Sequence, residues 1–275
     1  MLRHVPSPRL TSPDVLEQCL TVLRHVEIEA GNVPSKSMVA AEFLGGFLTW
    51  HATTESTLSY LLTPASLHDL LYSPRLWALR GMDAIAPSAR EWAELELRAR
   101  TAALVAARQT LLNAQTRWRS DNDTLCVPDT NLLLHHEKTL LYIPWRKIVQ
   151  ARAGVRVVLP VKVIDELDAQ KRTGKTQETR TRARATLREL RSTGVVGTTR
   201  WHTLLAEYGV VTKLEVLADD RDHQRMGDAD LEIVDRAAEL SELAGRQVVI
   251  VTSDVGMEVR AGTADVSVVF VESRA

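Results

Sequence analysis

The sequence predicts an α/β fold with a central parallel sheet, preceded by an all-α region. From residue 125 onward, short apolar runs alternate with helical patterns, as in parallel strands joined by helices. Residues 1–120 instead show helical spacing of apolar side chains without the alternation of strands. A polar break at residues 120–123 separates the two textures. We therefore expect an all-helical domain over 1–120 and an α/β domain over 125–275.

The first helix is expected to begin at Ser12-Pro13, which is a good N-cap followed by proline in the first turn. Six apolar residues then follow helical spacing: Val15, Leu16, Cys19, Leu20, Leu23 and Val26. A second helix is expected over residues 35–61. Pro64 and Pro74 punctuate short helices, and the longest helix runs from Ser88 to about 119.

The α/β region contains five apolar runs that we interpret as strands, at residues 125–127, 155–159, 210–217, 248–251 and 266–271. Helical patterns lie between them, at residues 132–136, 144–151, 161–170, 180–192, 230–244 and 255–261. Strands that alternate with helices in this way favour a parallel sheet with helices on its faces and right-handed crossovers.

Composition and cysteine content are those of an ordinary cytoplasmic globular protein. Of the 275 residues, 45% are hydrophobic and 25% are charged. Cys19 and Cys126 lie too far apart in sequence to suggest a disulfide framework or a zinc site, so we expect reduced thiols. Residues 1–10 lack the apolar core of a signal peptide, and no apolar run is long enough to span a membrane.

The formal net charge of −1 hides two opposite segments. Residues 138–200 contain 15 basic and 5 acidic side chains, whereas residues 201–275 contain 7 basic and 15 acidic ones. Within one domain this pattern suggests a surface that binds phosphates beside a site that binds cations.

Acidic side chains follow the predicted strands or open the next helix at four places. These are Asp129, Asp165-Glu166, Asp228 with Asp230, and Asp254. Because functional residues gather at the carboxyl ends of parallel strands, we expect these acids to converge at one edge of the sheet. Such carboxylates resist ionisation together unless a cation is present, and a hard divalent ion such as Mg²⁺ prefers their oxygens. Neither His nor Cys accompanies them at ligand spacing, which argues against zinc.

Four segments resemble the successive motifs of PIN domains and occur in the order of that family. They are Pro128-Asp129-Thr130-Asn131, Val163-Ile164-Asp165-Glu166, Gly227-Asp228-Ala229-Asp230 and Val251-Thr252-Ser253-Asp254. The resemblance covers about 150 residues and does not extend to residues 1–120. It implies a three-layer α/β/α sandwich and a ribonuclease, a hydrolase that depends on Mg²⁺ or Mn²⁺.

Carried over residue by residue, the resemblance makes Asp129, Glu166, Asp228 and Asp254 the catalytic and metal-binding acids. Asp228 fits the third position because Leu231 follows it three residues on, while Asp230 is the alternative or an additional ligand. Thr130, Asn131, Thr252 and Ser253 are expected to support the acids through hydrogen bonds. Asp165 and Asp168 are expected to face solvent, and His135 and His136 to lie outside the chemistry.

A basic segment follows the second motif and predicts a nucleic-acid-binding surface. Its expected contacts to phosphate are Lys171, Arg172, Lys175, Arg180, Arg184 and Arg188. Arg180, Arg184, Arg188 and Arg191 share one face of a helix because they are three or four residues apart. A solvated charged face is the simpler alternative. Trp118, between Arg117 and Arg119, is the one aromatic candidate for base stacking.

We therefore expect a metal-dependent endoribonuclease that cuts RNA, with a preference for single strands. Three alternatives remain open: a non-catalytic RNA-binding PIN module, the toxin of a toxin–antitoxin pair, and a DNA nuclease. The helical domain is expected to dock a protein partner, regulate the enzyme or position RNA. By analogy with the family, two chains are expected to pair as a homodimer.

Overall fold

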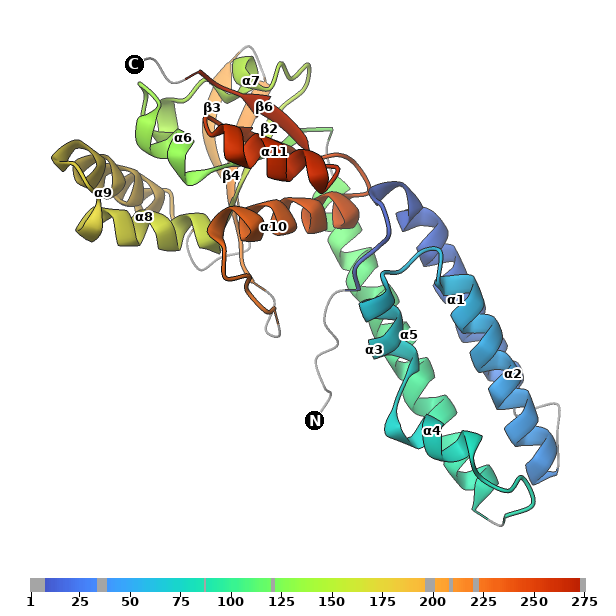
Figure 1. Ribbon diagram of the computed structural model, residues 1–275. Helices are drawn as coiled ribbons and strands as arrows, with labels where there is room; N and C mark the ends of the chain where they lie inside the picture. The colour runs from blue at the N-terminus through green and yellow to red at the C-terminus, as the bar shows by residue number, and fades with distance from the viewer. Residues whose placement is uncertain are drawn as a thin grey trace. The chain divides into compact units, whose positions relative to one another are not determined.

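The computed structural model describes residues 8–33, 39–86, 88–119, 122–195, 201–207, 210–219 and 223–272 (Figure 1). The chain divides into two compact units. A helical unit comprises residues 1–120 with 242–246, and an α/β unit comprises residues 121–241 with 247–275. In the described part of the chain, no helix is both long and apolar enough to cross a membrane.

The helical unit is built from five α-helices in its described residues: α1 (Leu16–Asn32), α2 (Ala40–Leu58), α3 (Pro64–Leu71), α4 (Pro74–Arg80) and α5 (Ala89–Arg119). Pro64 and Pro74 are the first residues of the short helices α3 and α4, and Thr63 and Ser73 cap these helices by accepting hydrogen bonds from N–H groups of their first turns. Ser12 makes no such bond; a 3-10 turn (η1, Pro13–Val15) precedes α1. The predicted start of the second helix, residues 35–38, lies outside the described residues.

The core of the helical unit lies where α1 and α2 pack against α5. Leu23, Phe47 and Leu104 are completely buried there. Trp118 is 2% exposed, and the guanidinium of Arg117 lies 4.5 Å from the centre of its ring. Trp118 is therefore no candidate for stacking on RNA bases, because its ring belongs to the core.

The α/β unit has a six-stranded sheet in its described residues, with the order β3-β4-β2-β1-β5-β6. The strands are β1 (Thr124–Pro128), β2 (Val155–Pro160), β3 (His202–Glu207), β4 (Val210–Leu217), β5 (Val249–Thr252) and β6 (Ser267–Phe270). All neighbouring strands are parallel except β3 and β4, which are antiparallel. The predicted central parallel sheet is confirmed, and β3 is an additional edge strand that the sequence analysis missed.

Helices flank this sheet, as predicted (Figure 1). They are α6 (Thr130–His135), α7 (Trp145–Ile148), α8 (Val161–Thr173), α9 (Gln177–Ser192), α10 (Ala229–Ala244) and α11 (Val255–Thr263), with a 3-10 turn η3 (Leu140–Tyr142). Helices α7 and α8 contact β2, whereas α11 contacts β5 and β6. Helix α9 packs on α8, α6 and the turn η3.

Strand β2 lies inside the sheet, and all six of its residues are buried. One of them is Arg156, whose guanidinium Nε lies 3.2 Å from the carboxylate of Glu215 on β4. Both side chains are at most 1% exposed, and Trp201 covers the guanidinium at 5.0 Å. Arg156 therefore contributes to the basic count of residues 138–200 but not to any binding surface.

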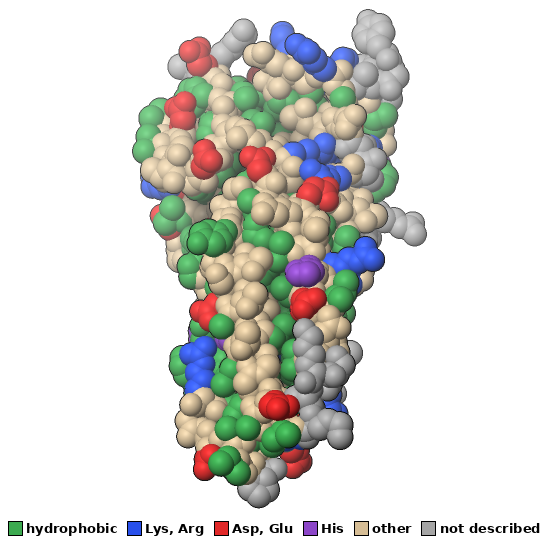
Figure 2. Space-filling model, turned by 90° about the vertical axis from the view of Figure 1, so that its right-hand side faces the viewer, with side chains coloured by type: hydrophobic (Ala, Val, Ile, Leu, Met, Phe, Trp, Pro, Cys, Tyr) green, Lys and Arg blue, Asp and Glu red, His purple; other side chains and the backbone are tan. Residues whose placement is uncertain are grey.

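The two cysteines are free and buried, one in each unit, which agrees with the expectation of reduced thiols. On the face that Figure 2 shows, acidic and basic side chains are interspersed with apolar and uncharged surface. Several large apolar side chains of the helical unit are well exposed: Ile28, Val39, Tyr60, Trp77 and Ile85.

Candidate metal-binding site

The candidate site lies where the strand order reverses. From β1 the chain proceeds to β2 and β4 on one side, and later returns to β5 on the other side. Asp129 follows β1 directly, and its backbone N–H donates to the carbonyl of Val251 on β5 at 3.0 Å. The ends of β1 and β5 are thus joined, which brings Asp129 beside the segment that carries Asp254. Crevices at such switch points are the usual ligand sites of open α/β sheets.

Asp129 is the most buried of the predicted acids, at 1% exposure. It is the N-cap of α6, where its Oδ1 accepts the N–H of Leu132 at 2.6 Å. Its Oδ2 accepts a hydrogen bond from the hydroxyl of Thr252, which is itself fully buried. Both oxygens are therefore fixed in orientation by neighbouring groups.

Burial raises the pKa of Asp129 to about 6. The hydrogen bonds from Thr252 and from the Leu132 N–H lower it, while the nearby carboxylates of Asp254 and Asp230 raise it further. The carboxylate thus lacks the positive charge that would favour its ionised form. A divalent cation is the kind of ligand that would supply this charge.

The supporting residues connect the acids in pairs. The Thr130 hydroxyl donates to Glu166 Oε2 at 2.6 Å and so ties α6 to α8. The amide of Asn131 donates to Asp254 Oδ2 at 3.3 Å. Asp254 is the N-cap of α11, and its backbone N–H donates to the hydroxyl of Thr252 at 2.9 Å. Ser253 makes no hydrogen bond among the described residues and lines a small pocket with Leu132, His135, His136, Glu137, Val271 and Glu272.

The two candidates for the third acid have different surroundings. Asp228 is exposed and accepts the N–H of Leu231 at 3.0 Å, and this hydrogen bond holds its pKa below the ordinary value. Asp230 is half-buried, and burial together with the charges of Asp228 and Asp254 raises its pKa against the opposing effect of Arg260. The negative charge of Asp230 raises the pKa of Asp129, whereas Asp228 is not among the groups that shift it. We call Asp129, Asp230 and Asp254 the acidic cluster.

Arg260, on α11, was not anticipated from the sequence. Its Nη1 donates to Asp230 Oδ2 at 3.0 Å. Gly256 lies one turn before it, and a Cβ at that position would meet Arg260 Nη1 at 2.8 Å and Asp254 Oδ1 at 3.1 Å. The guanidinium therefore lies across Gly256, next to two members of the acidic cluster. The only hint in the sequence is a basic residue six positions after Asp254 within an acidic segment.

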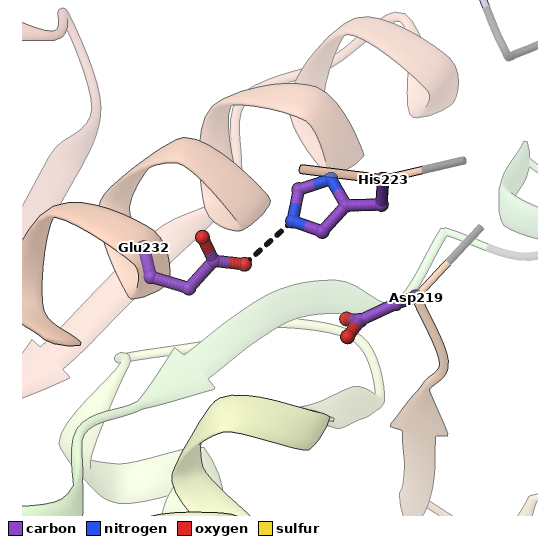
Figure 3. A group of neighbouring side chains, drawn as sticks. All are labelled: Asp219, His223 and Glu232. Atoms are coloured by element: carbon purple, nitrogen blue, oxygen red, sulfur yellow. Dashed lines mark hydrogen bonds and ion pairs between the residues drawn. The ribbon is translucent and has the colours of Figure 1, made fainter. Parts of the chain in front are cut away.

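A second group of ligand-type side chains lies elsewhere in the unit. One ligand atom from each of Asp219, His223 and Glu232 lies within 4.8 Å of the others (Figure 3). Among the described residues, the predicted acids form no group as tight as this one. Protein partners nevertheless account for it. His223 pairs with Glu232 at 2.6 Å, and Glu232 also accepts the Met226 N–H at 2.7 Å.

The remaining member, Asp219, pairs with Arg225 at 2.6 Å, and the same guanidinium reaches Asp165 at 2.6 Å. Asp165 is exposed, in line with the expectation that it faces solvent. We therefore interpret Asp219, His223 and Glu232 as ion pairs that hold the segment before α10.

The predicted phosphate contacts differ in their partners. Lys171 and Arg172 pair with Asp168, and the hydrogen bond from Lys171 holds the pKa of that carboxyl below its ordinary value. Arg180 donates to the carbonyl of Gly174 at 2.6 Å and to Gln177. By contrast, three exposed side chains have no partner among the described residues, namely Lys175, Arg184 and Arg188.

Arg182, which faces the other way, donates to the carbonyls of Leu133, His136 and Lys138 and so anchors α9 on the end of α6. Helix α9 therefore has a structural arginine on one face and solvent-exposed arginines on the other. The exposed set is the part of the basic segment that is available to a phosphate.

Comparison with known proteins agrees with this arrangement. The family model of the PIN domain matches residues 126–272, which span β1 to the end of β6 and include every acid of the site. No curated protein and no solved structure gave a match. The matched segment makes up more than half of the chain and coincides with the α/β unit. The chain belongs to the PIN domain family, a family of nucleases.

Proposed function

We propose that the protein is a metal-dependent endoribonuclease that hydrolyses the phosphodiester bonds of RNA. The observation that carries the proposal is Asp129, a buried carboxylate at the switch point of a parallel sheet whose pKa is raised to about 6. A folded protein retains such an uncompensated group at a cost, and perturbed carboxylates in a crevice are typical of functional sites. Family membership supplies the class of reaction.

The donor atoms fit Mg²⁺ or Mn²⁺. Asp129, Asp230 and Asp254 offer carboxylate oxygens, which are the ligands that hard divalent ions prefer. Glu166 adds a fourth carboxylate, held by Thr130 at 2.6 Å. We assign these four acids to the metal site, and we assign Asp228 to capping α10. A bound ion would activate a water molecule and stabilise the oxygens of an in-line displacement at phosphorus.

The protein's own residues hold the acids ready for this task. Thr252 and the Leu132 N–H fix the two oxygens of Asp129, and Asn131 fixes one oxygen of Asp254. Because these bonds form before any ligand arrives, little reorganisation is needed at the moment of reaction. Thr130, Asn131 and Thr252 are therefore positioning residues.

The exposed side chains Lys175, Arg184 and Arg188 are proposed to contact the RNA backbone. Arginine and lysine contacts to phosphate give affinity without reading sequence, which suits a nuclease whose chemistry acts on the backbone. Lys171, Arg172 and Arg180 are engaged by protein groups and contribute mainly to the surrounding potential.

The test is cleavage of labelled single-stranded RNA by the full chain with Mn²⁺ or Mg²⁺, beside EDTA and Asp129→Asn. Asp265→Asn is the matched control, because Asp265 is exposed with a φ of 56° that asparagine tolerates well. We expect cleavage that is lost with EDTA and with Asp129→Asn and kept with Asp265→Asn. Cleavage of single-stranded DNA at the same rate would contradict the choice of RNA. Intact RNA that still binds would contradict catalysis and favour a non-catalytic RNA-binding module.

A further inference from the structure

We propose that Arg260 is the protein's own cation in the acidic cluster. In the metal-free protein it neutralises Asp230; once a divalent ion takes that carboxylate, the released guanidinium binds a phosphate of the substrate. This inference rests on the proposed function: Arg260 would pair with Asp230 in the metal-free site and bind substrate phosphate in the metal-bound site.

The contacts of Arg260 place its charge where a metal ion would act. Its Nη1 lies 3.0 Å from Asp230 Oδ2, and the charge of Asp230 is one of those that act on Asp129. The two paired side chains are 38% and 31% exposed, so the pair is accessible to an incoming ion. A cation that binds through Asp230 Oδ2 must compete with the guanidinium for that oxygen.

Gly256 leaves room for the guanidinium at this place. Gly256 and Arg260 are four residues apart on α11 and share one face of the helix. A Cβ at position 256 would lie 2.8 Å from Arg260 Nη1, so a larger residue there would push the arginine side chain aside. The same position lies 3.1 Å from Asp254 Oδ1, whose other contact here is the Gly256 N–H at 2.6 Å. The arginine is thus packed along the N-terminal turn that also presents Asp254.

The chemistry of the two cations explains the exchange. Asp129, Asp230 and Asp254 are three neighbouring carboxylates, and Arg260 pairs with one of them, Asp230; this leaves an excess of negative charge that a divalent ion would neutralise better. Arginine stays charged after release and offers five N–H donors in a planar fork that matches phosphate oxygens. Because the side chain is half-exposed, it can turn toward the solvent side of the site without movement of α11.

The first measurement is Mn²⁺ binding to the full chain by calorimetry, for the wild type and for Arg260→Gln. Removal of the competing cation should tighten binding about two- to fivefold, the range expected for the loss of a partly exposed ion pair. Arg98→Gln is the matched control. It removes the same charge from an exposed pair with Glu94 in the helical unit and should leave Mn²⁺ affinity unchanged. Equal or weaker binding in Arg260→Gln would refute the competition.

The second measurement is the affinity for single-stranded RNA, with Ca²⁺ under conditions in which the RNA stays intact, and with EDTA. We expect Arg260→Gln to weaken RNA binding about tenfold with Ca²⁺, the loss of a charged hydrogen bond, and much less with EDTA. Arg260→Lys should recover part of the affinity, since it keeps the charge but not the fork. An equal loss in both conditions would show a general charge effect and overturn the exchange.

The outcomes separate this inference from the proposed function. If the wild type binds Mn²⁺, Asp129→Asn abolishes binding and Arg260→Gln changes nothing, only the role of Arg260 is wrong. If neither the wild type nor Arg260→Gln binds Mn²⁺, both the proposed metal site and the inference about Arg260 are refuted.

Discussion

Replacement of Asp129 by asparagine is expected to stabilise the metal-free protein above pH 7. The pKa of Asp129 is about 6, against an ordinary value of 3.8, so its ionisation costs the folded state about 3 kcal/mol. A carboxyl with a raised pKa makes the folded state bind more protons than the unfolded state. Stability therefore falls as pH rises from about 4 to about 6 and stays low above that.

Asparagine removes this cost, but its amide has only one oxygen and cannot accept the hydrogen bonds of both Leu132 and Thr252. The lost hydrogen bond reduces the gain in stability by about 1 kcal/mol. The net gain is about 2 kcal/mol, or roughly 4 to 8 °C in Tm for a domain of this size. Thermal unfolding followed by circular dichroism in EDTA measures it. At pH 4 the ionisation cost is largely absent while the hydrogen bond is still lost, so Asp129→Asn should unfold at the same or a slightly lower temperature; at pH 8 it should unfold later.

Added Mn²⁺ should reverse the order at pH 8. An ion at a hundred times its Kd stabilises the protein that binds it by about 2.7 kcal/mol, which Asp129→Asn forgoes. If Asp129→Asn were less stable than the wild type in EDTA at pH 8, the ionised carboxylate of Asp129 would not destabilise the metal-free protein, and this reasoning would be refuted.

Three further predictions concern other parts of the α/β unit. Glu215→Ala should destabilise it by about 3 to 5 kcal/mol in denaturant unfolding, because Arg156 would keep a buried charge without its carboxylate; adding Arg156→Met should recover much of the loss. Thr252→Val should weaken Mn²⁺ binding about 10- to 100-fold in calorimetry, since it removes a hydrogen bond that orients Asp129, and unchanged affinity would exclude that role. Arg184→Ala combined with Arg188→Ala should make the plot of log affinity against log salt concentration less steep by about 1.4, because each lost phosphate contact of a single strand contributes about 0.7 to the slope. Fluorescence anisotropy of labelled single-stranded RNA between low and moderate salt measures this slope.

The sheet and the placement of two acids follow from local sequence. Strands β1 and β5 are short apolar runs that end in Asp129 and in the Thr252-Ser253-Asp254 segment. Any parallel pairing of two such strands places their following residues at one edge. Strand β3 was missed because it is an edge strand that pairs only with β4, and its apolar run is limited to three residues between polar ones.

The choice between Asp228 and Asp230 depends on information that the motif does not contain. Two residues at the start of a helix point about 200° apart around its axis, so only the docking of α10 decides which of them faces the sheet edge. The same holds for Arg260, whose contact with Asp230 joins α11 to α10 across 30 residues of sequence. Both features arise from tertiary packing rather than from local preference.

Alkylation of the two buried cysteines would report local unfolding in each unit of the protein. Burial raises the pKa of Cys19 to about 12, and it raises that of Cys126 further, so neither thiol reacts with alkylating reagents while its surroundings remain folded. Cys19 is in α1, and Cys126 is in β1, three residues before Asp129. Mass spectrometry of pulse-labelled peptides would therefore time the unfolding of the helical unit and of the α/β unit separately, in one unmodified sample. Occupancy of the metal site should slow the labelling of Cys126, whereas labelling of Cys19 tracks the helices alone.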